Sequence, residues 1–130
     1  GANDTLREKI GEDYPRDTFR HEQDLLVTEN GKTALFAGCA HCGIVNILKS
    51  AEDVLGRAPD AVFAGFHLYN PSLGKSEPDE LVDAVGEKLR GDKVAHYFTG
   101  HCTGKEAYER LKRKLGDRLG EMPTGSDFTV

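Results

Sequence analysis

Three short apolar runs, each followed by a helical pattern, constrain the fold of this 130-residue chain more than any other feature. The runs are TALFAG (33–38), AVFAGF (61–66) and VAHYFTG (94–100), and each has the length and composition of a strand. They are apolar on both faces, which is typical of strands in a covered parallel sheet. The alternation with helices predicts an α/β layer of about one domain.

A hairpin and three helices complete the predicted order ββ-α-β-α-β-α. Asn30 and Gly31 separate two apolar runs and accept the positive φ angles of a type I′ turn, which predicts a hairpin. The first helix is expected to end at Gly56, and the second to begin at Ser76. A capping box formed by Thr103 and Glu106 is expected to begin the third. The apolar positions at helical spacing are Ile44, Ile47, Leu48, Ala51 and Leu55, then Leu81, Val82, Val85 and Leu89, then Ala107, Tyr108, Leu111 and Leu115.

The two ends of the chain carry weaker patterns. Residues 1–24 are polar, and Pro15 interrupts any helix there, so we interpret residues 1–16 as a linker or lead-in. Residues 17–130 form the predicted domain. Residues 121–130 are expected to add a last short strand.

Composition argues against several classes of partner. The net charge is −5 and there is no basic stripe, so a nucleic-acid partner is not expected. No apolar run approaches the ~20 residues that span a bilayer, so no membrane partner is expected either. The N-terminus lacks the pattern of a signal segment. Three cysteines are too few and an odd number for a disulfide scaffold, which favours the reducing cytoplasm.

Three of the five histidines follow the three predicted parallel strands. His41, His67 and His101 each stand just beyond a strand's carboxyl end, the edge at which ligands bind in α/β sheets. One histidine in such a place is more often a hydrogen-bonded structural residue. Three in equivalent places favour a metal site, because imidazole is a common metal ligand and a metal needs several ligands at one point. His96 is expected inside a strand, in the core or at the surface, and His21 is assigned no role.

The cysteines allow three interpretations. Cys39 and Cys42 form a C-x-x-C pair at the start of a helix, which could act as a redox pair. Together with His101 and Cys102 they could instead bind zinc. The third interpretation is that these cysteines are small buried apolar residues beneath the turn.

The segments around these residues resemble a known family. Residues 24–48 with GCAHCGIVNIL, residues 61–68 with GFHL, and residues 98–107 with GHCTG resemble the C-terminal half of metallo-β-lactamase-fold hydrolases. The closest likeness is to the branch of the dihydropterin ribofuranosyl-aminobenzene phosphate synthases, over about residues 17–127. The resemblance implies half of an αββα sandwich, with one largely parallel sheet, an N-terminal hairpin and three helices on one face.

The resemblance also implies a site and a reaction. His41 corresponds to the third histidine of the first metal site, and His101 to the late histidine that completes the second. His67 stands near the family's bridging aspartate and is the candidate catalytic residue, in contact with metal or substrate. The implied cofactors are divalent ions, zinc or alternatively iron or manganese, whose bound hydroxide hydrolyses a small molecule. That molecule is phosphorylated or pterin-like in the related branch.

The family's His-x-His-x-Asp-His block does not occur in residues 1–130. The metal site in this chain is therefore expected to be incomplete, and the chain inactive on its own. Its expected partner is the missing N-terminal half-domain, or a second copy bound through the apolar sheet face left exposed. Two alternatives stay open: a non-catalytic, self-associating half-domain, and a small C-x-x-C redox or structural-zinc protein.

Overall fold

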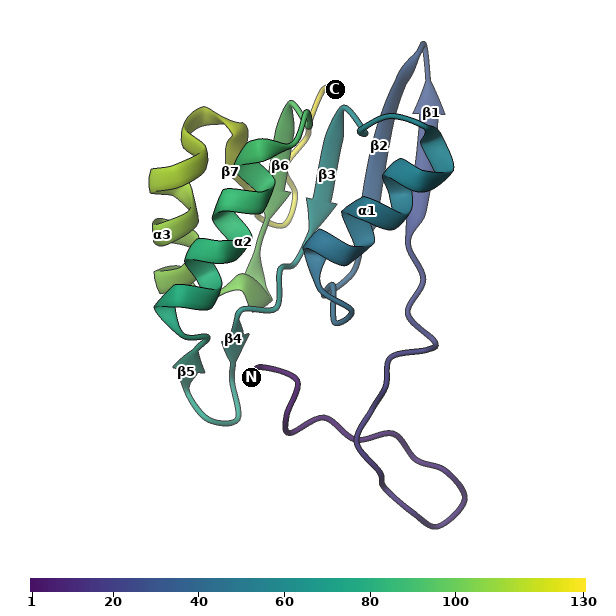
Figure 1. Ribbon diagram of the computed structural model, residues 1–130, viewed down its shortest axis with the longest axis vertical. Coiled ribbons are helices and arrows are strands. Elements are labelled where there is room, and N and C mark those ends of the chain that lie inside the picture. The colour runs from purple at the N-terminus through teal and green to yellow at the C-terminus, as the bar shows by residue number, and fades with distance from the viewer.

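In the computed structural model, which describes residues 1–130, three helices cover one face of a five-stranded sheet (Figure 1). The strands of this sheet are β1 (Leu25–Glu29), β2 (Lys32–Ala37), β3 (Ala61–Ala64), β6 (His96–Thr99) and β7 (Leu119–Glu121). Their order is β1-β2-β3-β6-β7, with β1 antiparallel to β2 and every other pair parallel. The predicted α/β class, hairpin and largely parallel sheet are confirmed.

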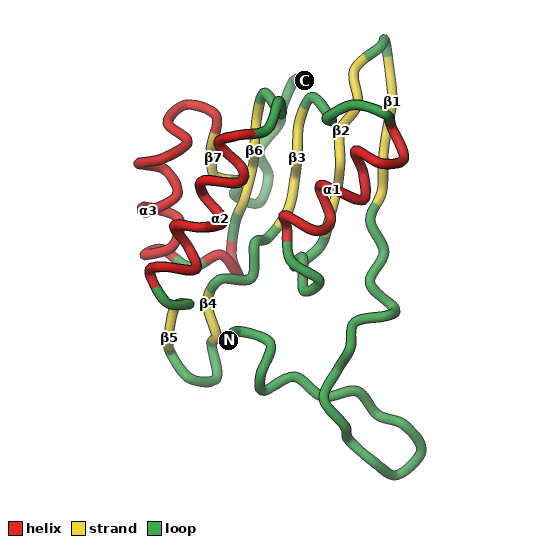
Figure 2. The backbone as a smooth tube through the Cα atoms, in the orientation of Figure 1, coloured by secondary structure: helices red, strands yellow, loops and turns green.

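The helices are α1 (Ile44–Leu55), α2 (Asp79–Gly91) and α3 (Lys105–Leu115). Short 3-10 turns, η1 (His101–Thr103) and η2 (Gly116–Arg118), flank α3, and a separate two-stranded ribbon joins β4 (Tyr69–Asn70) to β5 (Lys75–Ser76). Figure 2 shows how the helices and strands alternate along the chain. A cluster of 19 buried apolar residues fills the space between helices and sheet. None of the helices is long and apolar enough to cross a bilayer.

The β1–β2 hairpin has the turn that its sequence predicts. Asn30 has φ of 51° and Gly31 has φ of 78°, and Glu29 pairs with Lys32 across them. Positive φ at both central residues defines the type I′ turn, whose twist matches that of the strands it joins.

Three predicted boundaries were wrong. Thr103 does not cap α3: it lies in η1, where its hydroxyl accepts a hydrogen bond from the Phe66 backbone N–H at 2.9 Å and lies 2.6 Å from the Thr99 hydroxyl. The second helix begins at Asp79, since Ser76 belongs to β5. The last strand is Leu119–Glu121, and the residues after it form no strand.

Residues 1–24 contain no helix or strand of the sheet, yet parts of this segment pack on the domain. Ala2 and Phe19 are buried. Between them the chain makes a loop that extends from the body and returns, so that the N-terminus lies beside β4 (Figure 1). The Ala2 carbonyl accepts a hydrogen bond of 3.2 Å from the Asn70 side chain. The segment thereby reaches the edge of the sheet at which the histidines lie.

Candidate metal centre

The three candidate histidines lie in two groups at the carboxyl edge of the sheet. His41 and His67, which follow β2 and β3, have ring centroids 4.2 Å apart in an edge-on arrangement. His101, which follows β6, lies instead with Cys39 and Cys102. The sequence predicts the common edge, and the structure adds this division into a histidine pair and a mixed thiol–imidazole group.

His41 is held in a turn that leads directly into α1. Ala40 before it has φ of 47°, in the left-handed region, and Gly43 after it has φ of 91°. The ring of Phe19 stacks on the His41 ring with centroids 4.5 Å apart and planes 7° apart. The stacking contact with Phe19 and the edge contact with His67 together fix the plane of the His41 imidazole.

The Asn3 side chain determines which nitrogen of His41 is free. Its amide nitrogen donates to the His41 carbonyl at 2.7 Å, and its oxygen Oδ1 lies 3.1 Å from His41 Nδ1. Since an amide oxygen can only accept, Nδ1 carries the proton and Nε2 carries the lone pair. This is the usual orienting contact of a metal-binding histidine, in which the second nitrogen bonds a nearby oxygen.

Glu22 fixes the backbone of the same turn. Its two carboxylate oxygens accept hydrogen bonds from the backbone N–H groups of His41, at 2.7 Å, and Cys42, at 2.8 Å. Burial acts to raise the pKa of Glu22, but the hydrogen bonds from Cys42 and His41 outweigh it and lower the pKa overall. The carboxylate is thus held ionised at the start of α1, where the helix dipole favours negative charge.

His67 has an unusual backbone and an unpaired ring. Its φ of 48° lies in the left-handed region that residues with a Cβ rarely adopt, and such conformations cluster at functional sites. Both ring nitrogens are buried and neither has a hydrogen-bond partner. Burial, followed by the proximity of His41, lowers the pKa of His67, so the ring is neutral near pH 7.

The second group contains two thiols and one imidazole. Cys39 Sγ lies 3.5 Å from His101 Nε2, and the ligand atoms of Cys39, His101 and Cys102 all lie within 4.8 Å of one another. Burial, as the largest cause, raises the pKa of Cys102 to about 12. Cys39 and Cys102 are half-buried, which agrees in part with the interpretation of these residues as small apolar ones.

Cys42 does not join this group, although it forms the C-x-x-C pair with Cys39. Its thiol is exposed and lies 3.7 Å from the Phe19 carbonyl. A hydrogen bond to Glu22, with burial as the next cause, raises the pKa of Cys42 to about 11. The Cys42 thiol is thus protonated near pH 7, and the two cysteines of the pair contact different neighbours.

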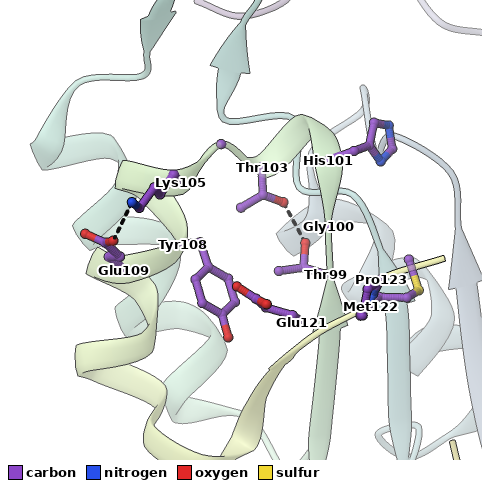
Figure 3. Close-up of a pocket in the computed structure, with 11 residues that line it drawn as sticks. Thr99, Gly100, His101, Thr103, Lys105, Tyr108, Glu109, Glu121, Met122 and Pro123 are labelled. Atoms are coloured by element: carbon purple, nitrogen blue, oxygen red, sulfur yellow. Dashed lines mark hydrogen bonds and ion pairs between the residues drawn. The ribbon is translucent and has the colours of Figure 1, made fainter. Parts of the chain in front are cut away.

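Each group borders a cavity. A cavity of about 360 Å³ is lined by His41 and His67 together with residues of the N-terminal segment and Glu77. A second, of about 410 Å³, lies between β6, α3 and β7, and includes Tyr108 and Glu121. His101 lies at the rim of this second cavity, with its ring turned away from Tyr108 and Glu121 (Figure 3).

Sequence patterns did not indicate Asn3, Phe19 or Glu22 as parts of the site. These residues lie 38, 22 and 19 positions before His41, in a segment without helical or strand periodicity. The other two histidines belong to neither group, although the His21 ring lies 6.2 Å from that of Phe19. His96 is exposed, and His21 is exposed with one ring nitrogen 3.9 Å from the Asp17 carboxylate.

The donor set fits a divalent metal ion. The unpaired ring of His67 offers one lone-pair nitrogen and the oriented His41 offers Nε2, and imidazole donors of this kind suit zinc, copper and iron. Two imidazoles are fewer than the three protein ligands typical of catalytic zinc, so further donors are required.

Comparisons with known proteins place this geometry in context. No protein-family model matches the chain. Over 101 residues it is 33% identical to 7,8-dihydropterin-6-methyl-4-(beta-D-ribofuranosyl)-aminobenzene-5'-phosphate synthase of Methanocaldococcus jannaschii, covering 77% of this chain and 32% of that protein. The whole chain also aligns with 50% of a crystal structure of a metal-dependent hydrolase of the β-lactamase superfamily, with a TM-score of 0.81 and 22% identity.

The chain therefore has the fold of half of a metal-dependent hydrolase of the β-lactamase superfamily, as the resemblance implies. Within that class, the sequence similarity is to the dihydropterin ribofuranosyl-aminobenzene phosphate synthase branch, and the stated resemblance is confirmed. The chain spans about half the length of the solved structure and about a third of the length of the M. jannaschii protein.

Proposed function

We propose that this chain contributes part of the active site of a metal-dependent hydrolase, with His41 and His101 as metal ligands and His67 as a catalytic residue beside His41. The observation that carries the proposal is the His41–His67 pair, whose imidazoles meet at the carboxyl edge of the sheet with ring nitrogens free to bind. The fold comparison supports the same class of protein.

The residues of the chain would act mainly by orientation. Asn3 keeps the proton of His41 on Nδ1, so that Nε2 keeps its lone pair for a metal ion, while Glu22 and Phe19 fix the turn and the ring. The neutral His67 would bind either the metal or the substrate. A divalent ion held there, zinc or alternatively iron or manganese, would supply an activated water by lowering its pKa to about 7.

The remaining ligands would come from a His-x-His-x-Asp-His block, which does not occur in residues 1–130. We therefore expect the isolated chain to be inactive, and the open face of its sheet to bind the half-domain that carries this block. The name of the M. jannaschii relative suggests a small, phosphate-bearing or pterin-like substrate. Three free cysteines are consistent with the reducing cytoplasm.

A reconstituted enzyme tests this function. The chain is co-expressed with the part of the M. jannaschii relative that lies outside the matched region, and the purified complex is assayed for bound metal and for hydrolysis of a chromogenic phosphodiester. We expect hydrolysis by the complex and none by the chain alone. His41→Ala should lower the rate at least about 100-fold, since even residues that only orient metal ligands contribute 10- to 100-fold.

His21→Ala is the matched control, because His21 is an exposed histidine whose ring lies near Phe19, with centroids 6.2 Å apart, and is not part of the His41–His67 pair. Its rate should stay within about twofold of the wild type. A co-purified complex that hydrolyses equally well with and without His41 would contradict the proposed role. A complex that binds no metal and hydrolyses nothing would favour a non-catalytic half-domain.

A further inference from the structure

The thiol–imidazole group connects strands that are not neighbours. Cys39 follows β2, whereas His101 and Cys102 follow β6, and β3 lies between these two strands in the sheet. The ligand atoms of all three nevertheless lie within 4.8 Å of one another, and the side chains of His101 and Cys102 lie against Gly65, at the carboxyl end of β3. A group of this kind requires the backbone at the end of β3 to leave room for it.

Gly65, the residue after β3, provides that room. A Cβ at this position would lie 2.4 Å from Cys102 Sγ and 3.3 Å from His101 Cε1, so any other residue would displace the group. The Gly65 backbone N–H donates to the Gly38 carbonyl at 2.8 Å, which ties the end of β3 to the turn that carries Cys39. The three side chains are thus presented by a hydrogen-bonded scaffold.

The separations suit a tetrahedral ion. With zinc–sulfur bonds of about 2.3 Å and zinc–nitrogen bonds of about 2.0 Å, neighbouring ligand atoms of a tetrahedral site lie roughly 3.5 to 3.8 Å apart. Cys39 Sγ and His101 Nε2 are already 3.5 Å apart. The other separations are below 4.8 Å, so closing them requires movements of at most about 1 Å, within reach of small side-chain rotations.

We infer that Cys39, His101 and Cys102 form a binding site for a thiophilic divalent cation, zinc in the first place, that this chain can fill without another polypeptide. This site shares His101 with the proposed hydrolase site but differs from it in its other donors. It adds two soft sulfurs to one imidazole, whereas His41 and His67 offer nitrogen alone. The three ligands leave one tetrahedral position for water or an external ligand.

Binding has a structural consequence. The ion links the carboxyl ends of β2 and β6 across β3, and only the folded chain brings these residues together. A ligand that binds only the folded state raises its stability by an amount that grows with ligand concentration over Kd. Zinc should therefore raise the unfolding temperature of the isolated chain, whether or not the chain takes part in hydrolysis.

Cobalt titration of the reduced chain tests the site. Co²⁺ bound to thiolates gives a strong charge-transfer band in the near ultraviolet, which histidine ligands alone do not give. We expect this band at one ion per chain, displaced by zinc. Cys39→Ser and Cys102→Ser should each weaken binding at least tenfold and reduce the band by about half, with folding checked by circular dichroism.

The matched control is Cys42→Ser, which removes a thiol from the same turn but outside the group. It should leave the band and the affinity unchanged. A band that disappears equally in Cys42→Ser, or no band at all in the wild type, would overturn the inference. His41→Ala should keep the band, so failure of the hydrolase proposal and failure of this site give different results.

A measurement on the wild-type chain avoids the risk that a variant misfolds. The chain is alkylated with iodoacetamide with and without stoichiometric zinc, and the modified cysteines are mapped by mass spectrometry. We expect zinc to slow labelling of Cys39 and Cys102 at least tenfold and to leave Cys42 accessible. If zinc left the labelling rates of Cys39 and Cys102 unchanged, this result would contradict the site.

Discussion

The two faces of the sheet differ sharply, although the same strands build both. On the face covered by helices, the side chains are almost fully buried: Leu35, Val62, Tyr97 and Leu119 are each 1% exposed or less. On the opposite face, Leu25, Val27 and Phe36 are 59%, 44% and 40% exposed. Both faces are apolar, but the packing available within this chain covers one of them fully and the other only in part.

The open face is organised around a row of aromatic rings. Phe36, Phe63 and Phe98 are in register across β2, β3 and β6, with successive ring centroids 4.9 Å apart. Phe128, in the C-terminal tail, shields the Phe63–Phe98 end of the row. Its ring centroid lies 5.4 Å from that of Phe63 and 4.4 Å from that of Phe98. The exposed end, with Phe36, Leu25 and Val27, resembles an interface more than a solvated surface.

Adjacent residues of β2 provide the strongest test of this difference. Leu35 faces the helices at 1% exposure, and Phe36 faces the open side. Leu35→Ala should lower the free energy of unfolding by about 3 kcal/mol, because it removes buried methyl groups and leaves a cavity. Phe36→Ala should cost about 1 kcal/mol, from partial burial and ring stacking. Urea unfolding at low protein concentration measures both changes.

Concentration distinguishes the two variants further. The loss in Leu35→Ala should be the same at 1 and 50 µM protein, because the core lies within one chain. Equal destabilisation by the two variants at both concentrations would mean that the open face is packed as tightly as the core. That result would contradict the difference in packing between the two faces of the sheet.

Local sequence rules predicted much of the fold. The Asn30-Gly31 turn and the strand and helix order follow from residue chemistry within a few positions. Where a tertiary contact competes, the local rule failed. Thr103 has the spacing of a capping residue, but its hydroxyl instead bonds the Phe66 backbone, and α3 begins after Gly104.

The site was predictable to the same extent. Placing histidines beyond parallel strands identifies the right edge, but not which of them meet. His101 lies with the cysteines because Gly65 lets Cys102 approach. Gly65 belongs to a neighbouring strand end, 35 or more residues before His101 and Cys102 in the sequence, so no local pattern predicts this contact. The supports of His41 come from a segment with no periodic pattern, so only the folded chain reveals them.

Self-association is the second test of the comparison. The exposed apolar surface of the open face should drive association of the isolated chain, as we propose for its partner binding. Phe36→Lys should raise the dissociation constant at least tenfold, because it would bury a charge in the interface. Sedimentation velocity over 1–100 µM measures the change.

Val54→Lys is the control for that experiment, since Val54 is 77% exposed but lies on α1, on the helix side of the sheet. Its dissociation constant should match that of the wild type. A wild-type chain that stays monomeric throughout, or a Val54→Lys variant that dissociates as readily as Phe36→Lys, would contradict association through the open face.

The smallest change in stability is expected for substitutions on the outer surface of the helices, where charged side chains form ion pairs. The hydrogen bond from Arg110 is the largest cause that lowers the pKa of Asp83 to about 2. Burial acts in the opposite direction, and the hydrogen bond from Lys114 adds to the lowering. Because the folded pKa lies below the unfolded value, the contribution of Asp83 is present above about pH 4 and is lost as the pH falls toward 2. The stability difference between wild type and Asp83→Asn should therefore shrink between pH 5 and pH 2, and also with added salt.

Urea unfolding across this pH range measures the difference. Glu109→Gln is the control, because the Lys105 partner of Glu109 is 4.0 Å away and 88% exposed. A difference that stays constant over the range would show that solvent screens the Asp83 pair almost completely, so that this pair adds little to the stability that the covered apolar face provides.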